Sequence, residues 1–341
     1  MITHAPAAAE LLATGVRHDR AGSIAAAIDA YAAAIEAADG AEPAAASDAL
    51  RRLARLHHLR AEGDAARALA GRAAAVAAGA GLPVLAAAAL NALGEFALAA
   101  GDLAEARERF ESALELGGAD PAVAGRVDRN IGLLHHVRGE WPEAAAHYRR
   151  AAALASRHGD ASAQARAGHR LATLAAEQGQ WEEAHRELRR AIGIALREGD
   201  AHLEARCLLD QARLHVALER WTEARDGAER ALRTFDRLEA RRDQSAAHRV
   251  LGVIFRETRR PALAESRLRS AVEIAVSARC PLNEAEARRE LAELCWRQGR
   301  PTDALVELDT ACRLFGRVGA RADVAEVERR IDRARGALRG A

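Results

Sequence analysis

Few residues of this chain have types and spacings that could support catalysis or metal binding. Glu182 and His185 have the Glu-x-x-His spacing of di-iron carboxylate sites, but such sites need a second copy and further inward carboxylates. Glu143 and His147 stand one helical turn apart, which suits a contact on a helix surface. We interpret these residues as parts of solvated helix faces.

The other motifs that carry chemistry are incomplete or missing. The doublets His57-His58 and His135-His136 cannot converge on one metal ion, because neighbouring side chains diverge on a helix. The four cysteines form no Cys-x-x-Cys pair, and no Gly-x-Ser-x-Gly sequence occurs. We therefore expect no catalytic residue, no metal site and no cofactor, and we predict that the protein is not an enzyme.

The charged residues exclude further classes. All 50 cationic residues are arginines, which excludes Schiff-base and P-loop lysine chemistry. They oppose 49 acidic residues, and the net charge of +1 argues against a nucleic-acid binder or an anionic-membrane binder. The scattered cysteines fit a reducing compartment. We expect a cytoplasmic protein of a bacterium with a GC-rich genome.

A repeat of about 40 residues organises the chain. The sequence from Gly139 to Ala144 recurs from Gly179 to Ala184, and weaker copies place the third residue, the anchor, at 24, 65, 103, 141, 181, 221, 261 and 301. Nine residues before the anchor stands Gly or Ala, except for Leu56 in the second unit. Alanine stands three and ten residues after every anchor, and a bulky residue usually seven after. These spacings predict two antiparallel helices that cross closely.

This pattern resembles the tetratricopeptide repeat (TPR) family, whose repeats are helical hairpins. The resemblance implies an all-α, right-handed solenoid of eight hairpins plus a capping helix. Asp120, Asp160 and Asp200 suit helix N-caps, and Pro121 and Pro281 suit first helical positions. We expect one domain over residues 1–341, with repeats at 8–46, 48–82, 87–118, 121–159, 161–198, 201–239, 244–279 and 282–318, and a capping helix at 321–340.

The resemblance also implies a ligand groove, because in this family the first helices line a concave surface. The family's inward positions correspond to 15, 12, 8, 5 and 4 residues before each anchor. In repeats four to eight these 25 positions hold nine arginines and four glutamates, so their net charge is +5. The predicted groove residues are Arg126, Arg129, Arg166, His169, Arg206, Arg213, Arg249, Arg256, Arg289, Trp296 and Arg297.

The first three repeats place apolar residues at the same positions. These include Leu12, Val16, Leu50, Leu53 and Leu98. Since guanidinium groups bind carboxylates in a bidentate manner, we predict a module that binds an acidic protein or peptide segment with an apolar anchor. Two alternatives stay open: a bacterial sensor whose solenoid changes shape on binding a peptide or small ligand, and a homo-oligomeric scaffold assembled through the N-terminal repeats.

Overall fold

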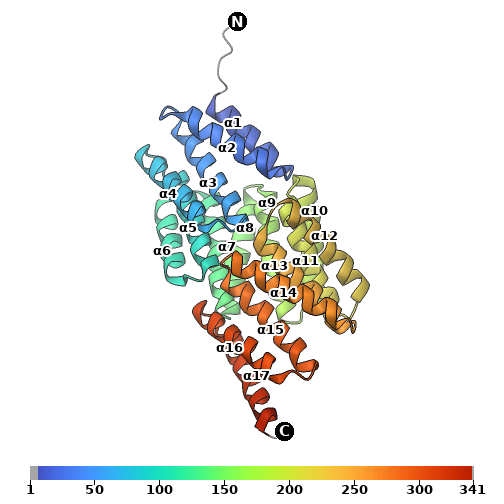
Figure 1. Cartoon of the computed structure of the whole chain (residues 1–341). Coiled ribbons are helices and arrows are strands. Elements are labelled where there is room, and N and C mark those ends of the chain that lie inside the picture. The colour runs from blue at the N-terminus through green and yellow to red at the C-terminus, as the bar shows by residue number, and fades with distance from the viewer. Residues whose placement is uncertain (1–6, 340–341) are drawn as a thin grey trace.

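The computed structural model describes residues 7–339, and over this range the chain forms seventeen α-helices and no strand (Figure 1). Odd-numbered and even-numbered helices pair as eight antiparallel hairpins, and α17 follows the last hairpin. This confirms the all-α solenoid. The helices are α1 (Ala8–Arg20), α2 (Ile24–Ala38), α3 (Pro43–Leu59), α4 (Gly63–Gly79), α5 (Pro83–Ala100), α6 (Leu103–Gly117), α7 (Pro121–Val137), α8 (Trp141–Arg157), α9 (Ala161–Glu177), α10 (Trp181–Glu198), α11 (Ala201–Ala217), α12 (Trp221–Arg237), α13 (Arg241–Glu257), α14 (Pro261–Ser277), α15 (Pro281–Arg297), α16 (Pro301–Arg317) and α17 (Arg321–Arg339).

Short polar caps and prolines fix where the first helices begin. The side chains of Asp120, Asp160 and Asp200 each accept a hydrogen bond from the backbone N–H three residues further on, at 2.9, 2.8 and 3.0 Å. Pro121 and Pro281 are the first residues of α7 and α15, where the missing N–H costs no helical hydrogen bond. The predicted caps are therefore confirmed.

A residue with left-handed backbone stands two positions before the second helix of every hairpin. In the second repeat this residue is Ala61, with φ 66°, and α4 begins at Gly63. The expected anchor at 65 is therefore wrong, and the correct anchor is 63. The error arose because Gly63 was aligned with the turn glycines of other repeats, whereas it is already helical. In the corrected register Ala54, not Leu56, stands nine residues before the anchor.

Four hairpins close on a size match between a glycine of the first helix and a large side chain of the second. An added Cβ on Gly132 would lie 2.7 Å from Cε1 of Tyr148, and one on Gly94 would lie 2.5 Å from Cε1 of Phe110. Tyr148 and Phe110 are fully buried. Because the ring occupies the space that a methyl group would need, these hairpins require glycine on the first helix.

The solenoid winds until its C-terminal half returns to its N-terminal half. In Figure 1, α13 (orange) lies beside α7, and residues of α3, α5, α7, α13 and α15 line one common cavity. Arg242 Nη1 donates to His58 Nε2 at 2.6 Å, and Arg60 Nε lies 2.9 Å from Glu239 Oε2. One apolar core cluster contains residues of α2 and α3 together with residues of α11 to α17. We call this contact between the two halves of the solenoid the seam. It joins residues 22, 58–64, 101–103 and 139 to residues 238–242, 279–281 and 318–322.

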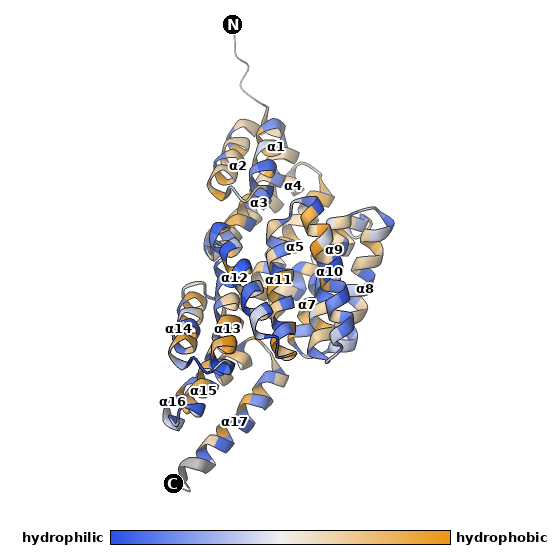
Figure 2. Cartoon of the chain, turned by 90° about the vertical axis from the view of Figure 1, so that its right-hand side faces the viewer, coloured by the Kyte–Doolittle hydropathy of each residue, from blue (hydrophilic) through white to orange (hydrophobic). Residues whose placement is uncertain are grey.

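The last helix covers the open end of the final hairpin. Val327, Ile331 and Ala334 of α17 are buried, and Figure 2 shows alternating hydrophobic and hydrophilic residues along this helix. Burying one apolar stripe while exposing a polar back is what a terminal solenoid helix requires. Residue 340 of the predicted capping helix lies outside the described residues.

One helix, α5, is long and apolar enough to cross a membrane, with a mean hydropathy of 1.5 over 18 residues. Its sequence is rich in alanine, and Ala86 to Ala89 are buried among neighbouring helices. In the structure α5 is the first helix of the third hairpin, so the solenoid accounts for its apolar sequence.

The size match predicts opposite effects of the same substitution at two helical glycines. We expect Gly132→Ala to lower the free energy of unfolding by about 1–3 kcal/mol, because the new methyl group overpacks against Tyr148. Gly71→Ala in α4 should raise it by up to about 1 kcal/mol, because nothing lies within 4 Å of its added Cβ and alanine favours the helix. Urea denaturation followed by circular dichroism measures both. Stabilisation by both substitutions would contradict the size match.

Candidate functional site

The first helices surround a cavity of about 310 Å³, which we call the central cavity. Its wall contains residues of α3, α5, α7, α9, α11, α13 and α15, and Val318 after α16. His58 and Arg242, which bond across the seam, both line it. The wall is therefore continuous only because the solenoid closes.

One of the repeat positions that face the cavity lies one residue from the position predicted from the sequence. From α11 the cavity is lined by Arg206, Asp210 and Arg213, which stand 15, 11 and 8 residues before the anchor. Arg170 of α9 also stands 11 before its anchor and lines the cavity. The prediction used position 12 instead, and one residue turns about 100° around a helix. It therefore missed Arg170 and Asp210.

Most of the predicted groove arginines have carboxylate partners. Arg249 Nη2 lies 2.9 Å from Glu286 Oε2, and Arg289 Nη1 lies 2.6 Å from Asp323 Oδ1. Several of the carboxylates stand outside the 25 sampled positions, so the excess of positive charge is largely cancelled. The other pairs are Arg166 with Asp200, Arg206 with Asp243, Arg213 with Asp210, Arg256 with Glu257 and Glu290, and Arg297 with Glu257 and Glu293.

Of the eleven predicted groove residues, only Arg206 and Arg213 line the central cavity. His169 is buried, and its Nε2 lies 2.7 Å from Asp210 Oδ2. This bond ties α9 to α11 within the wall. Trp296 is partly exposed in a hollow of about 30 Å³ that it shares with Arg330 and Ala334 of α17. Neither side chain lines the central cavity.

Among the predicted groove arginines and Arg170, three have no carboxylate at ion-pair distance within residues 7–339. They are Arg126, Arg129 and Arg170. The Arg129 guanidinium donates only to Asn130 Oδ1, at 3.2 and 3.4 Å. Burial, reinforced by the charges of Arg166, Arg170 and Arg206, lowers the pKa of Arg129 to about 10, while Glu95 opposes this change.

Arg170 is in the same situation. Burial lowers the pKa of Arg170, and the charge of Arg206 lowers it further. A guanidinium group withdrawn from water without a counter-charge is unfavourable, so an anionic group that reached it would be held strongly. We call Arg129 and Arg170 the arginine pair.

The N-terminal repeats are less apolar toward the cavity than predicted. Leu50 and Leu53 belong to the core, with 1% and 6% of their surface exposed. In the corrected register the second repeat instead presents Arg55, His58 and Leu59 to the interior of the solenoid. The two-residue error in the anchor is the cause of this difference.

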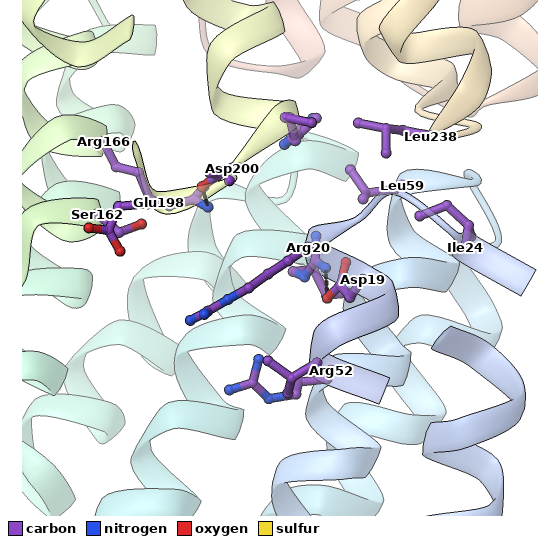
Figure 3. Close-up of a pocket in the computed structure, with 15 residues that line it drawn as sticks. Asp19, Arg20, Ile24, Arg52, Leu59, Ser162, Arg166, Glu198, Asp200 and Leu238 are labelled. Atoms are coloured by element: carbon purple, nitrogen blue, oxygen red, sulfur yellow. Dashed lines mark hydrogen bonds and ion pairs between the residues drawn. The ribbon is translucent and has the colours of Figure 1, made fainter. Parts of the chain in front are cut away.

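A second pocket of about 230 Å³ lies at the seam (Figure 3). Arg20 and Arg52 line it from the N-terminal hairpins, and Arg166 and Asp200 from the middle of the chain. Its inner charges are paired, since Arg55 bonds to Asp19 and Arg166 to Asp200. The seam pocket shares Leu59 and His202 with the central cavity, so the two spaces adjoin.

The buried His169 predicts a pH dependence of stability. Burial lowers its pKa to about 4 from 6.5, while the bond to Asp210 opposes this change. Between these values the unfolded chain binds a proton that the folded chain does not, so stability falls as the pH falls. We expect the loss between pH 7 and pH 5 to be about 1–2 kcal/mol smaller in His169→Gln. Urea denaturation at both pH values measures this, and equal losses in both proteins would show that the folded imidazole is protonated.

Comparisons with known proteins agree with this architecture. Two sequence models of the tetratricopeptide repeat match residues 123–197 and residues 209–275 and 266–315, together more than half of the chain. A search of curated proteins gives no match.

Several solved structures share the fold. A Rap protein complexed with competence and sporulation factor superposes with a TM-score of 0.62 at 13% identity, covering 98% of each chain. Cut9 of the APC/C Cut9–Hcn1 hetero-tetramer has a TM-score of 0.64 at 14% identity, over 93% of this chain and 55% of that one.

A signal-transduction ATPase gives a third likeness. The STAND protein PH0952 from Pyrococcus horikoshii, which has a tetratricopeptide repeat sensor, has a TM-score of 0.53 at 14% identity, over 76% of this chain and 42% of that one. At such identities the likenesses show the fold alone. With the repeat matches and the eight observed hairpins, they lead to one conclusion: this chain belongs to the tetratricopeptide repeat family.

Proposed function

We propose that this protein is a non-enzymatic interaction module that holds an acidic segment of a partner protein or peptide in the central cavity. Membership of a repeat family that forms interaction solenoids supports the general role. The observation that carries the proposal is the arginine pair. Arg170 lines the cavity, and Arg129 lies behind the wall, close enough for the charges of Glu95, Arg170 and Arg206 to act on it. Neither has a carboxylate partner in the described chain, whereas seven of the predicted groove arginines do.

A carboxylate is the group that best satisfies this site. A guanidinium can donate two parallel hydrogen bonds to a carboxylate, and a hydrogen bond to a charged group contributes roughly 1.5–3 kcal/mol. Leu98, Leu133 and Val137 also line the cavity and can contact an apolar side chain next to the acidic one. A volume of about 310 Å³ suits a few residues of a segment and not a folded domain.

A second candidate function is a sensor whose solenoid changes shape on binding. The observation that favours it is that His58 and Arg242 lie both in the seam and in the cavity wall. An occupant would contact both halves of the chain at once, and small rotations between repeats add along a solenoid. A ligand in the central cavity would thereby favour the form of the solenoid in which the seam is closed.

The interaction proposal predicts which peptides the protein selects and which residues they need. A random peptide display library selected on the wild type should be enriched in Asp and Glu. Arg129→Gln or Arg170→Gln should weaken the selected peptide by about 10–100-fold, the equivalent of one charge-assisted bond. Glu95→Gln should strengthen it, because this carboxylate competes for Arg129. Isothermal titration calorimetry measures each affinity.

Arg189→Gln is the matched control, because Arg189 is exposed on the second helix α10. It should bind like the wild type. Selected peptides without acidic residues, or an unchanged affinity in both arginine-pair variants, would contradict the proposal.

The sensor proposal predicts a change of shape with the same peptide. We expect the radius of gyration measured by small-angle X-ray scattering to fall when the peptide occupies the cavity, because the occupant links the two sides of the seam. A bound peptide that leaves the radius unchanged would remove the sensor function and leave the interaction function standing.

A further inference from the structure

At one position of the repeat, seven repeats have a residue with a side chain and the fifth has glycine. Thirteen residues before the anchor, polar side chains bond to the second helix of their own hairpin: Arg150 donates to Asp128 at 2.6 Å, and Arg288 donates to Glu307 at 2.7 Å. The fifth repeat has Gly168 there. The residues at this position in the other repeats are Leu11, Leu50, Leu90, Asp128, Leu208, His248 and Arg288.

The missing side chain leaves a groove of about 240 Å³ between α8 and α10, with α9 as its floor. We call it the outer groove, because second helices form its sides, whereas first helices line the central cavity. Its lining combines the apolar residues Ala145, Leu171, Leu174, Ala191 and Ile194 with the polar residues Gln164, Gln178 and Gln180.

Neither the backbone nor the packing requires glycine at this position. Gly168 lies inside α9 and does not have a positive φ, and the nearest atom to an added Cβ is Glu187 Oε2 at 3.5 Å, an ordinary contact. Gly132, in contrast, is needed to admit Tyr148. A glycine inside a helix weakens that helix, so the open groove is the structural consequence that distinguishes Gly168.

We propose that the outer groove docks an amphipathic helix of a partner protein, which inserts a large apolar side chain over Gly168. A groove between two helices accepts the ridge of a third, and the described residues offer no strand edge to an extended segment. This site goes beyond the proposed function, because it lies on different helices from the arginine pair and takes a different ligand.

The charged residues that border the outer groove indicate which charges the partner helix has. Arg149 borders the groove on the α8 side, whereas on the α10 side two carboxylates, Glu183 and Glu187, outnumber one cation, Arg190. None of these four residues has an ion pair within residues 7–339. The complementary helix therefore has an acidic residue flanking its apolar residue on the α8 side and a basic residue on the α10 side.

The test fills the groove with leucine, the side chain that four other repeats have at the same position. The probe is a display library of amphipathic helical peptides with Leu or Phe on one face, selected on the wild type. We expect selected helices with the acidic and basic flanks described above. Gly168→Leu should keep native circular dichroism and a melting temperature no lower than that of the wild type, and should weaken the selected helix at least tenfold.

Gly71→Leu is the matched control, since it adds the same side chain at a helical glycine with nothing within 4 Å, and it should bind like the wild type. Arg149→Glu supplies a second variant that leaves the groove open, and it should weaken the helix while a peptide with the flanking acid changed to Lys recovers binding. Failure to select any helix, or equal affinity for wild type, Gly168→Leu and Arg149→Glu, would overturn the proposal. Unchanged binding of the helix by Arg170→Gln separates this result from that of the central cavity.

Discussion

The contact between a small residue on the first helix and a larger residue on the second is the interaction on which the rest of the structure depends. Where the second helix supplies Tyr148 or Phe110, the first supplies Gly132 or Gly94. Each match sets how closely two helices cross, and the rotations between successive repeats add along a solenoid. The accumulated rotation brings α13 and α15 back to α3 and α5, and this return creates the seam and the central cavity.

Closing the solenoid withdraws many charged side chains from water, and the structure compensates for most of them. Carboxylates reach arginines of the neighbouring first helix, as Glu286 reaches Arg249, and His169 bonds to Asp210 within the wall. An unpaired buried charge is far less favourable than a paired one. The arginine pair is therefore set apart by its surroundings, and not by a general excess of positive charge in the groove.

The periodic features of the fold could be predicted from the sequence, and the features that join distant repeats could not. Alanine spacing, Asp caps and prolines repeat within each unit, so the helices followed from them. The second anchor was misplaced because Ala61, and not Gly63, takes the left-handed turn. Arg170 was missed because its position lies one residue from the predicted one, and the bond between His58 and Arg242 joins residues 184 positions apart, which no repeat pattern specifies.

An engineered disulfide tests directly whether the C-terminal half of the solenoid closes against the N-terminal half at the seam. An added Cβ on Gly139 would lie 3.7 Å from Ala322 Cβ, close to the separation of about 3.8 Å in natural disulfides. Non-glycine residues already occupy the equivalent turn position at Glu219 and Arg259. In a Cys312→Ser background, Gly139→Cys/Ala322→Cys should oxidise rapidly to an intramolecular disulfide, measured by mass spectrometry of the folded protein. Gly179→Cys/Ala322→Cys, whose turn lies outside the seam, should not, and equal rates in the two proteins would contradict closure at the seam.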